Sequence, residues 1–191
     1  RAVDSIIEKG NVSINNKLAT LGSKVSKGDT ILVKIIQKDL TYALYHKPRG
    51  EVTGPVAVLP GCQPIGRLDK ESEGLLLYSN DYRVVDALLN PKYGREKEYE
   101  VTIREEATYS PVKTISIYNE GYSLRIVLTE GKKHEIRRML NALNLTISSL
   151  KRVRIMSFVL RGIKSKSHHM LSKQQVATLF KDLSIPLDTK S

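Results

Sequence analysis

The chain of 191 residues is poor in several kinds of residue: it has no tryptophan, two phenylalanines and one cysteine. With Cys62 alone it cannot build a framework of internal disulfides, which fits a reducing compartment. It also lacks any apolar run near the ~20 residues of a membrane-spanning helix, and its first residues do not resemble a signal peptide. We therefore expect a folded protein that works away from membranes, with tyrosine as its main aromatic residue.

The chain does have an excess of positive charge. It carries 31 Lys and Arg residues against 20 Asp and Glu residues, a formal net charge of +11. Residues 130–166 hold ten of these cations against two acids, Glu130 and Glu135, so this segment alone contributes +8. Clustered cations suit a polyphosphate partner, because binding releases counterions. Basic proteins also bind membranes or acidic proteins, so charge by itself gives nucleic acid only a modest lead.

The hydrophobic pattern divides the chain into a small first module and a larger second domain. Residues 1–38 predict the end of a helix and two short strands, too little for a large core. In residues 41–185 we expect strands at 41–45, 75–78, 98–103, 122–128 and 150–160, and helices at 82–89, 132–143 and after a capping box formed by Ser172 and Gln175. Because strands outnumber helices and short links join them, we predict an α+β fold with a largely antiparallel mixed sheet flanked by helices.

The most informative stretch is a charged loop that leads into a buried strand. Five charged residues lie between Gly66 and Gly74, and Leu75 to Tyr78 follow as an apolar run. Such a loop cannot be core, because an unpaired buried charge costs several kcal/mol or more. Asp69 lies near its middle, between cations that favour the ionised carboxylate. From the residues alone, a solvated or loop-capping aspartate is at least as good an interpretation as a catalytic one.

This loop, with Gly66-Arg67-Leu68-Asp69 followed by Ser72, Gly74 and the leucine run, resembles the active-site motif of pseudouridine synthases. It is most similar to the branch that modifies ribosomal RNA and carries an N-terminal S4-like RNA-binding module. The similarity continues in the family's order through Lys47-Pro48-x-Gly50, Lys97-Glu98-Tyr99 and the segment from Gly131 to Met139. It implies a pseudouridine synthase catalytic domain over residues 41–185. Residues 1–38 would be a partial S4-like module, in which the chain begins after the usual first helix.

The resemblance also implies which residues act. Asp69 matches the catalytic aspartate, Tyr99 the active-site tyrosine and Arg137 the arginine that pairs with the aspartate. Further residues on or beside these motifs are expected to contact the substrate: Arg67, Lys97, Ile136, Arg138 and Lys47. From the basic cluster we expect a second set to bind RNA: Lys132, Lys133, Lys151, Arg152 and Arg154.

Two residues depart from the family's pattern. His46 stands where asparagine is usual, and we expect it to stabilise a turn after the strand at 41–45. Glu135 stands where glutamine is usual, and an acid at this point lowers the expected affinity for RNA. The segments between Gly50 and Pro64 and around residues 108–111 are also shorter than is common in the family.

The reaction that the family performs needs little beyond a carboxylate. It breaks the bond from ribose C1′ to N1 of the base, turns the base and joins C5 to C1′. No redox step occurs and no group is lost, so neither a metal nor an organic cofactor is required. The cysteine and histidines do not have metal-ligand spacing. Asp69 can serve as nucleophile or as base, and the sequence leaves both roles open.

Two functions of different class therefore remain. The first is a ribosomal RNA pseudouridine synthase, with the large subunit slightly favoured by Arg154-Ile155-Met156 and Gly162; the second is a catalytically silent RNA-binding ribosome-assembly factor on the same fold. The aspartate favours the enzyme, because a binding-only protein has no need of it. We expect ribosomal RNA or a pre-ribosomal particle as partner, no membrane partner and a monomer. Its location would be the cytoplasm of a bacterium or the organelle matrix of a eukaryote.

Overall fold

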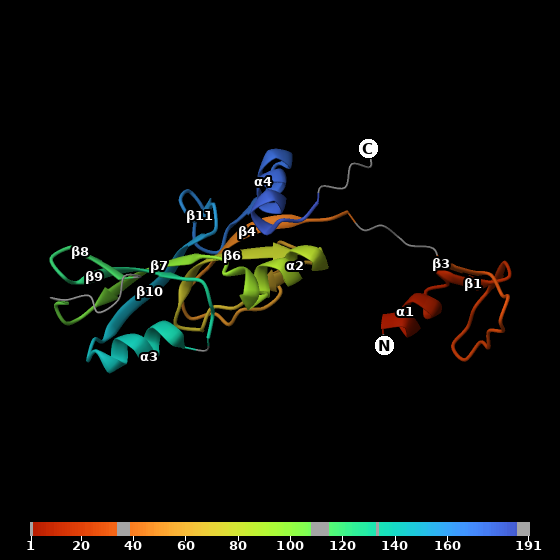
Figure 1. The fold of residues 1–191 in the computed structure, drawn as a ribbon, viewed down its shortest axis with the longest axis horizontal. Helices are drawn as coiled ribbons and strands as arrows, with labels where there is room; N and C mark the ends of the chain where they lie inside the picture. Colours follow the sequence, from red (N-terminus) through yellow and green to blue (C-terminus); the bar gives the residue numbers. More distant parts are fainter. Residues whose placement is uncertain (1, 34–38, 108–114, 133, 187–191) are drawn as a thin grey trace. The chain divides into compact units, whose positions relative to one another are not determined.

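A computed structural model describes residues 2–33, 39–107, 115–132 and 134–186, which belong to two compact units (Figure 1). The first unit is Arg1–Asp39 and the second is Leu40–Ser191. Within the described ranges, no helix is long and apolar enough to cross a membrane.

The first unit is a helix with a small antiparallel sheet. Helix α1 (Ala2–Glu8) precedes strands β1 (Val12–Ile14), β2 (Lys17–Leu18) and β3 (Ile31–Val33), which pair in the order β2-β1-β3. Asn15 and Asn16 turn the chain with φ of 47° and 63°, a left-handed conformation that asparagine tolerates. The Asn15 side chain then donates to Asp29 at 2.8 Å and joins the two turns. That this unit is an S4-like RNA-binding module stays a prediction.

The second unit is built on one mixed sheet with the strand order β12-β4-β6-β10-β7-β9-β8, with β5 beside β6 and β11 beside β10. Its strands are β4 (Tyr42–Lys47), β5 (Gln63–Ile65), β6 (Glu73–Ser79), β7 (Lys97–Ile103), β8 (Ile115–Tyr118), β9 (Ser123–Leu128), β10 (Ile147–Ile155), β11 (Phe158–Val159) and β12 (His168–Met170). The pairing of β6 with β10 is parallel and the other pairings of the described strands are antiparallel. The predicted α+β class with a largely antiparallel sheet is confirmed.

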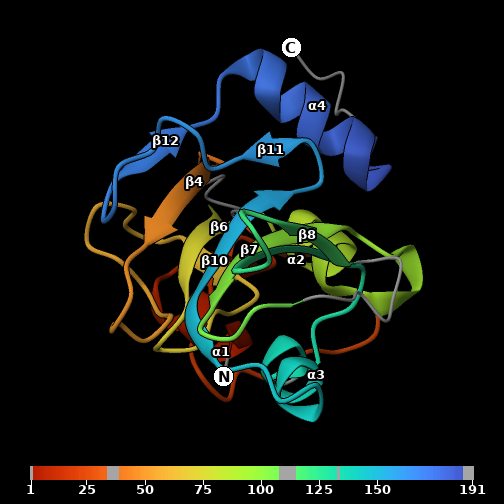
Figure 2. The same ribbon diagram turned by 90° about the vertical axis from the view of Figure 1, so that its left-hand side faces the viewer.

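Helices cover both faces of this sheet, as Figures 1 and 2 show for α3 (Glu135–Ala142) and α4 (Lys173–Leu183). Each face has its own apolar core. Leu76 and Tyr78 of β6 belong to the core that includes Ile136 of α3. Leu75 and Leu77 belong to the core that includes α2 (Tyr82–Leu89) and α4. A strand buried on both faces needs a continuous apolar run, which explains the uninterrupted leucines.

The predicted helix at 82–89 and the capping box of α4 are both present. The hydroxyl of Ser172 accepts from the backbone of Gln175, and the side chain of Gln175 accepts from the backbone of Ser172. These two bonds satisfy donors that would otherwise have no partner in the first turn of α4.

Strand β4 is longer than predicted, because it continues to Lys47 instead of ending at Tyr45. Pro48 has no backbone N–H and ends the pairing there. His46 therefore lies in the strand and not in a turn, and the expectation that it stabilises a turn is wrong. Its Nδ1 lies 2.9 Å from the carbonyl oxygen of Ile163, which ties β4 to the segment before β12.

The parallel strands β6 and β10 approach closely at Gly74, which faces Arg152 in the register. A Cβ atom added to Gly74 would lie 2.6 Å from the backbone nitrogen of Arg152 and would also collide with its carbonyl oxygen. The φ of Gly74 is +117°, which L-residues rarely adopt. Both constraints call for glycine at this position.

We expect Gly74→Ala to lower the free energy of unfolding by about 2–4 kcal/mol, because backbone strain and overpacking combine. Urea denaturation of the second unit within the full chain measures the effect. Gly162→Ala is the matched control: Gly162 has φ of +86° but no atom within 4 Å of the added Cβ, so only strain of about 1–2 kcal/mol is expected. Equal losses of unfolding free energy in the two variants would show that β6 and β10 can move apart to accommodate a methyl group without further destabilisation.

Candidate active site

The charged loop is a well-held connection between β5 and β6. The hydroxyl of Thr53 accepts from the Leu68 backbone at 3.0 Å and donates to the Leu68 carbonyl at 2.8 Å. One residue later, the carbonyl of Asp69 accepts from the backbone N–H of Ser72 at 3.0 Å. The backbone on both sides of Asp69 is thus anchored, while its side chain remains 39% exposed. A fixed backbone that presents an accessible carboxylate is typical of reactive residues.

Helix α3 brings two side chains to the two oxygens of that carboxylate. The Nε of Arg137 lies 3.6 Å from Oδ2 of Asp69, and the Nε2 of His134 lies 3.5 Å from Oδ1. Arg137 also donates to the hydroxyl of Ser72 at 3.1 Å, which fixes the guanidinium against the same loop. The sequence predicted that Asp69 and Arg137 lie together, and they do.

His134 was not predicted as part of this site. It precedes α3 with φ of 54°, and it caps the helix without a side-chain hydrogen bond. The left-handed backbone costs a non-glycine residue about 1–2 kcal/mol and here turns the imidazole toward Asp69. A histidine directly before an arginine-rich helix is the signal that could have pointed to it.

A cavity of about 810 Å³ lies beside Asp69 and Arg137, which is large enough for a nucleotide. Tyr99 of β7 lines it, and its side chain is buried to 8% exposure. Arg152 faces Tyr99 across the β7–β10 pairing, so both side chains lie on one face of the sheet. Lys97 lies two residues before Tyr99 on the same face and also lines the cavity.

Arg152 does not lie on the surface, where a cation that tracks backbone phosphates would lie, and its contact with RNA stays a prediction. Arg152 is 3% exposed, its Nε donates to the carbonyl of Leu75 at 2.7 Å, and its Nη2 has no partner in the described part of the chain. Its guanidinium lines the cavity. Lys97 donates to the carbonyl of Arg95 at 3.0 Å, and burial together with the charge of Arg152 lowers the pKa of its ammonium group.

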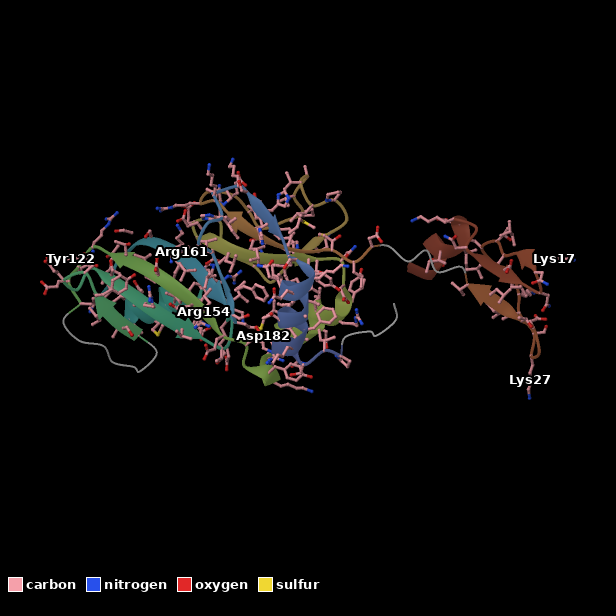
Figure 3. All side chains as sticks on the ribbon, turned by 90° about the horizontal axis from the view of Figure 1, so that it is seen from above. Lys17, Lys27, Tyr122, Arg154, Arg161 and Asp182 are labelled. Carbon is pink, nitrogen blue, oxygen red and sulfur yellow. The ribbon has the colours of Figure 1, made fainter. Side chains whose placement is uncertain are left out.

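Other predicted RNA-binding cations are engaged by acids of the chain itself. Arg154, labelled in Figure 3, donates to Glu98 at 2.7 Å and to Glu96 at 3.2 Å. Lys151 lies 3.4 Å from Glu73. Because these acids neutralise them, Lys151 and Arg154 attract a polyanion less strongly than unpaired cations would.

The remaining cations differ in position. Lys132 is exposed and lies 2.7 Å from Glu130, whereas Lys133 lies outside the described residues. Arg67 and Arg138 are exposed, and Arg67 also lines the cavity. These positions are compatible with contact to the substrate, which stays a prediction. Ile136 also lines the cavity while it anchors α3 in the core.

Lys47 is not available to a substrate, and its predicted role is wrong. The side chain is 2% exposed, and its ammonium group donates to the carbonyls of Pro48 and Glu51 at 2.8 and 2.6 Å. Burial lowers the pKa of this group, although Glu51 and other carboxylates oppose the shift. The buried ammonium group of Lys47 therefore stabilises the turn after β4 by hydrogen bonding to two of its carbonyl oxygens.

Among the described residues, no group of three or more His, Cys, Asp or Glu side chains could hold a metal ion. What the arrangement offers is an oriented carboxylate, an aromatic wall, the buried Arg152 and the half-buried Lys97 in one cavity. It can act on a molecule with a planar ring by attack or proton transfer at the carboxylate.

Comparison with known proteins gives consistent matches. A family model described as RNA pseudouridylate synthase matches residues 41–142, just over half of the chain. The dual-specificity RNA pseudouridine synthase RluF of Escherichia coli K12 is 31% identical over 213 residues, covering 95% of this chain and 73% of that protein. The ribosomal large subunit pseudouridine synthase B of Bacillus subtilis is 29% identical, covering 94% and 89%. A crystal structure of a pseudouridylate synthase superposes with a TM-score of 0.65 over 93% of this chain and 92% of that one; at 21% identity, this shows a shared fold.

We expect Lys47→Met to lower the free energy of unfolding by about 1–3 kcal/mol, because it leaves two carbonyl oxygens of the turn without their donor. The methionine keeps the aliphatic stem, so the loss isolates the ammonium group. Lys70→Met, at an exposed position of the neighbouring loop, is the control and should stay within about 0.5 kcal/mol of the unmodified protein. Urea midpoints that do not distinguish the two variants would contradict a structural role for Lys47.

Proposed function

Because the chain belongs to the RNA pseudouridylate synthase family, as its motifs predicted, we propose that it converts a specific uridine of ribosomal RNA to pseudouridine. The observation that carries this proposal is Asp69, held by Arg137 and His134 at the mouth of a cavity lined by Tyr99. The name of the Bacillus subtilis relative supports ribosomal RNA of the large subunit as the substrate, whereas the name of the Escherichia coli relative specifies RNA alone. We also propose that the protein acts as a monomer, on free ribosomal RNA or on a pre-ribosomal particle.

In this reaction Asp69 is the reacting carboxylate. The guanidinium of Arg137 restricts the rotation of this carboxylate, because an ion pair with a fixed partner has one preferred geometry. His134 approaches the other oxygen from the same helix. The carboxylate is thus oriented before substrate arrives, which removes part of the entropic cost of reaching the transition state. Attack on the sugar and abstraction of a proton from it are both compatible with this arrangement.

The uridine must leave its stack to enter the cavity, at a cost of a few kcal/mol. In the proposed complex, the ring of Tyr99 forms the wall on which the extruded base rests. Stacking on an aromatic ring returns roughly 1–3 kcal/mol per base. Arg67 and Arg138, which are both exposed, would hold the backbone of the RNA. The first unit would add further RNA contacts as an S4-like module.

We expect Asp69→Asn to abolish pseudouridine formation, because the amide is nearly isosteric but neither nucleophilic nor basic. Arg137→Ala should slow the reaction, and the double variant should be little worse than Asp69→Asn, because residues that act as a unit are non-additive. The assay is single-turnover pseudouridine formation on ribosomal RNA fragments, with RNA affinity measured in parallel.

RNA affinity should change little in Asp69→Asn, which separates chemistry from binding. Full activity of that variant would overturn the role of Asp69. If the unmodified protein forms no pseudouridine in any ribosomal RNA or assembly intermediate but still binds RNA, a silent assembly factor is the better assignment.

We expect Tyr99→Phe to retain much more activity than Tyr99→Ala, because phenylalanine keeps the stacking face and loses only the hydroxyl. On the stacking energy above, the difference is about 5- to 150-fold in the single-turnover rate constant. Equal rates for the two variants would show that the ring does not support the base.

A further inference from the structure

The cations of the β7–β10 region fall into two groups that differ in how their charge is balanced. On one face of the sheet, each cation meets an acid. Arg154 pairs with Glu96 and Glu98, and Arg125 of β9 pairs with Glu98 and Glu100 at 3.1 and 3.0 Å. On this face, glutamates therefore neutralise the arginines in a network of ion pairs.

On the cavity face the cations are not balanced. For Arg152 and Lys97, the described part of the chain offers no carboxylate within 4.0 Å. Glu135 acts on Lys97 only from a distance and accepts instead from the backbone of Lys132 at 3.0 Å. Arg152 is buried, and a buried cation without an acid is expensive, so this position suits a ligand that supplies the missing negative charge.

A β-bulge separates the two groups. The register pairs Arg152 with Tyr99 and Arg154 with Glu98, so Val153 is an extra residue in β10. In a regular strand, Arg152 and Arg154 would share a face. The bulge sends Arg154 to the glutamates and leaves Arg152 beside Tyr99 in the cavity, with its Nη2 unpartnered among the described residues.

We propose that Lys97 and Arg152 together form an anion subsite that holds the uracil ring and stabilises the negative charge which it carries once the glycosidic bond breaks. The proposal rests on the function proposed above. The C1′–N1 bond breaks heterolytically, and its electron pair stays on the base as uracil anion, shared among N1, O2 and O4. Either C1′ bonds to the carboxylate of Asp69, or C2′ gives its proton to that carboxylate and a C1′–C2′ double bond forms as the base leaves. The anion forms by both routes. C5 then bonds to C1′, either as the bond from C1′ to Asp69 breaks or as C2′ takes its proton back from Asp69. The C5 proton then leaves and N1 takes up a proton, so no oxidant is needed.

The position of Arg152 favours the base over a phosphate as its ligand. It is the cross-strand neighbour of Tyr99, so its side chain lies on the same face of the sheet as the ring on which the base would stack. It is also 3% exposed at the inner wall of the cavity, whereas a backbone phosphate would stay near solvent. Preorganised donors at the point where charge develops are an efficient use of such a cation.

The test compares Arg152→Met and Lys97→Met with Arg125→Met as matched control, since Arg125 is an ion-paired cation of the neighbouring strand. We expect single-turnover rate constants to fall about 10²- to 10³-fold in each of the first two variants, as for loss of an oxyanion donor. RNA affinity should stay within about threefold. Arg125→Met should react at the normal rate. Near-normal rates in Arg152→Met and Lys97→Met would overturn the subsite.

A phosphate ligand would give a different result: weaker RNA binding and a log–log salt slope smaller by about 0.7, with little change in the bound rate. That outcome also overturns the proposal. If Arg152→Met fails to fold, Lys97→Met carries the test. If the unmodified protein is active and both variants react at near-normal rates, only the anion subsite is contradicted. If the unmodified protein is inactive, the proposed function is contradicted as well.

A leaving-group comparison separates stabilisation of the anion from a merely structural defect. RNA with 5-fluorouridine at the target carries a base whose anion is more stable, because fluorine withdraws electrons. The loss of the starting nucleotide should therefore depend less on Arg152 and Lys97 than it does with uridine, and the variants should be partly rescued. Mass spectrometry of digested RNA measures both rates. Equal fold-losses with the two bases would show that the side chains act only through the fold.

Discussion

The close contact between Gly74 and the backbone of Arg152 is the constraint on which the second unit depends. It joins the two parallel strands through which the β12-β4-β6 part of the sheet meets the β10-β7-β9-β8 part. A side chain at position 74 would separate these strands. The loop that carries Asp69 leads directly into β6, and Tyr99 lies one strand beyond β10. The contact therefore sets how far the carboxylate lies from the aromatic wall.

Around this junction the sheet separates two kinds of electrostatic environment. Its outer face neutralises cations with glutamates, so charges there contribute to strand pairing and little to attraction of a polyanion. Its cavity face keeps Arg152 and Lys97 without acids, so their charge is available to a ligand. The number of cations in the chain therefore overstates how many of them are free to attract a polyanion. The same sheet provides rigidity on one side and a reactive environment on the other.

Much of the fold could be predicted because periodicity records burial. The helix at 82–89 and the capping box of Ser172 were predicted as they occur, and the leucine run before Tyr78 correctly indicated a buried strand. The short strands β2, β5, β8 and β12 were missed. Two to four residues carry too little periodicity, and these strands form only because a longer neighbour offers its backbone. The juxtaposition of Asp69 and Arg137 followed from the family's motifs and not from periodicity.

By itself, the sequence determined the fold class, the family, the loop that carries the carboxylate and the helix that meets it. These features depend on local patterns and motifs. Only the tertiary structure decided what each cation does. Lys47 belongs to a motif and yet lies in the interior, and His134 lies beside Asp69 although no motif indicated it. Arg152 and Arg154 are two residues apart and look equivalent in sequence. The bulge between them, which depends on the pairing with β7, places one in the cavity and the other among glutamates.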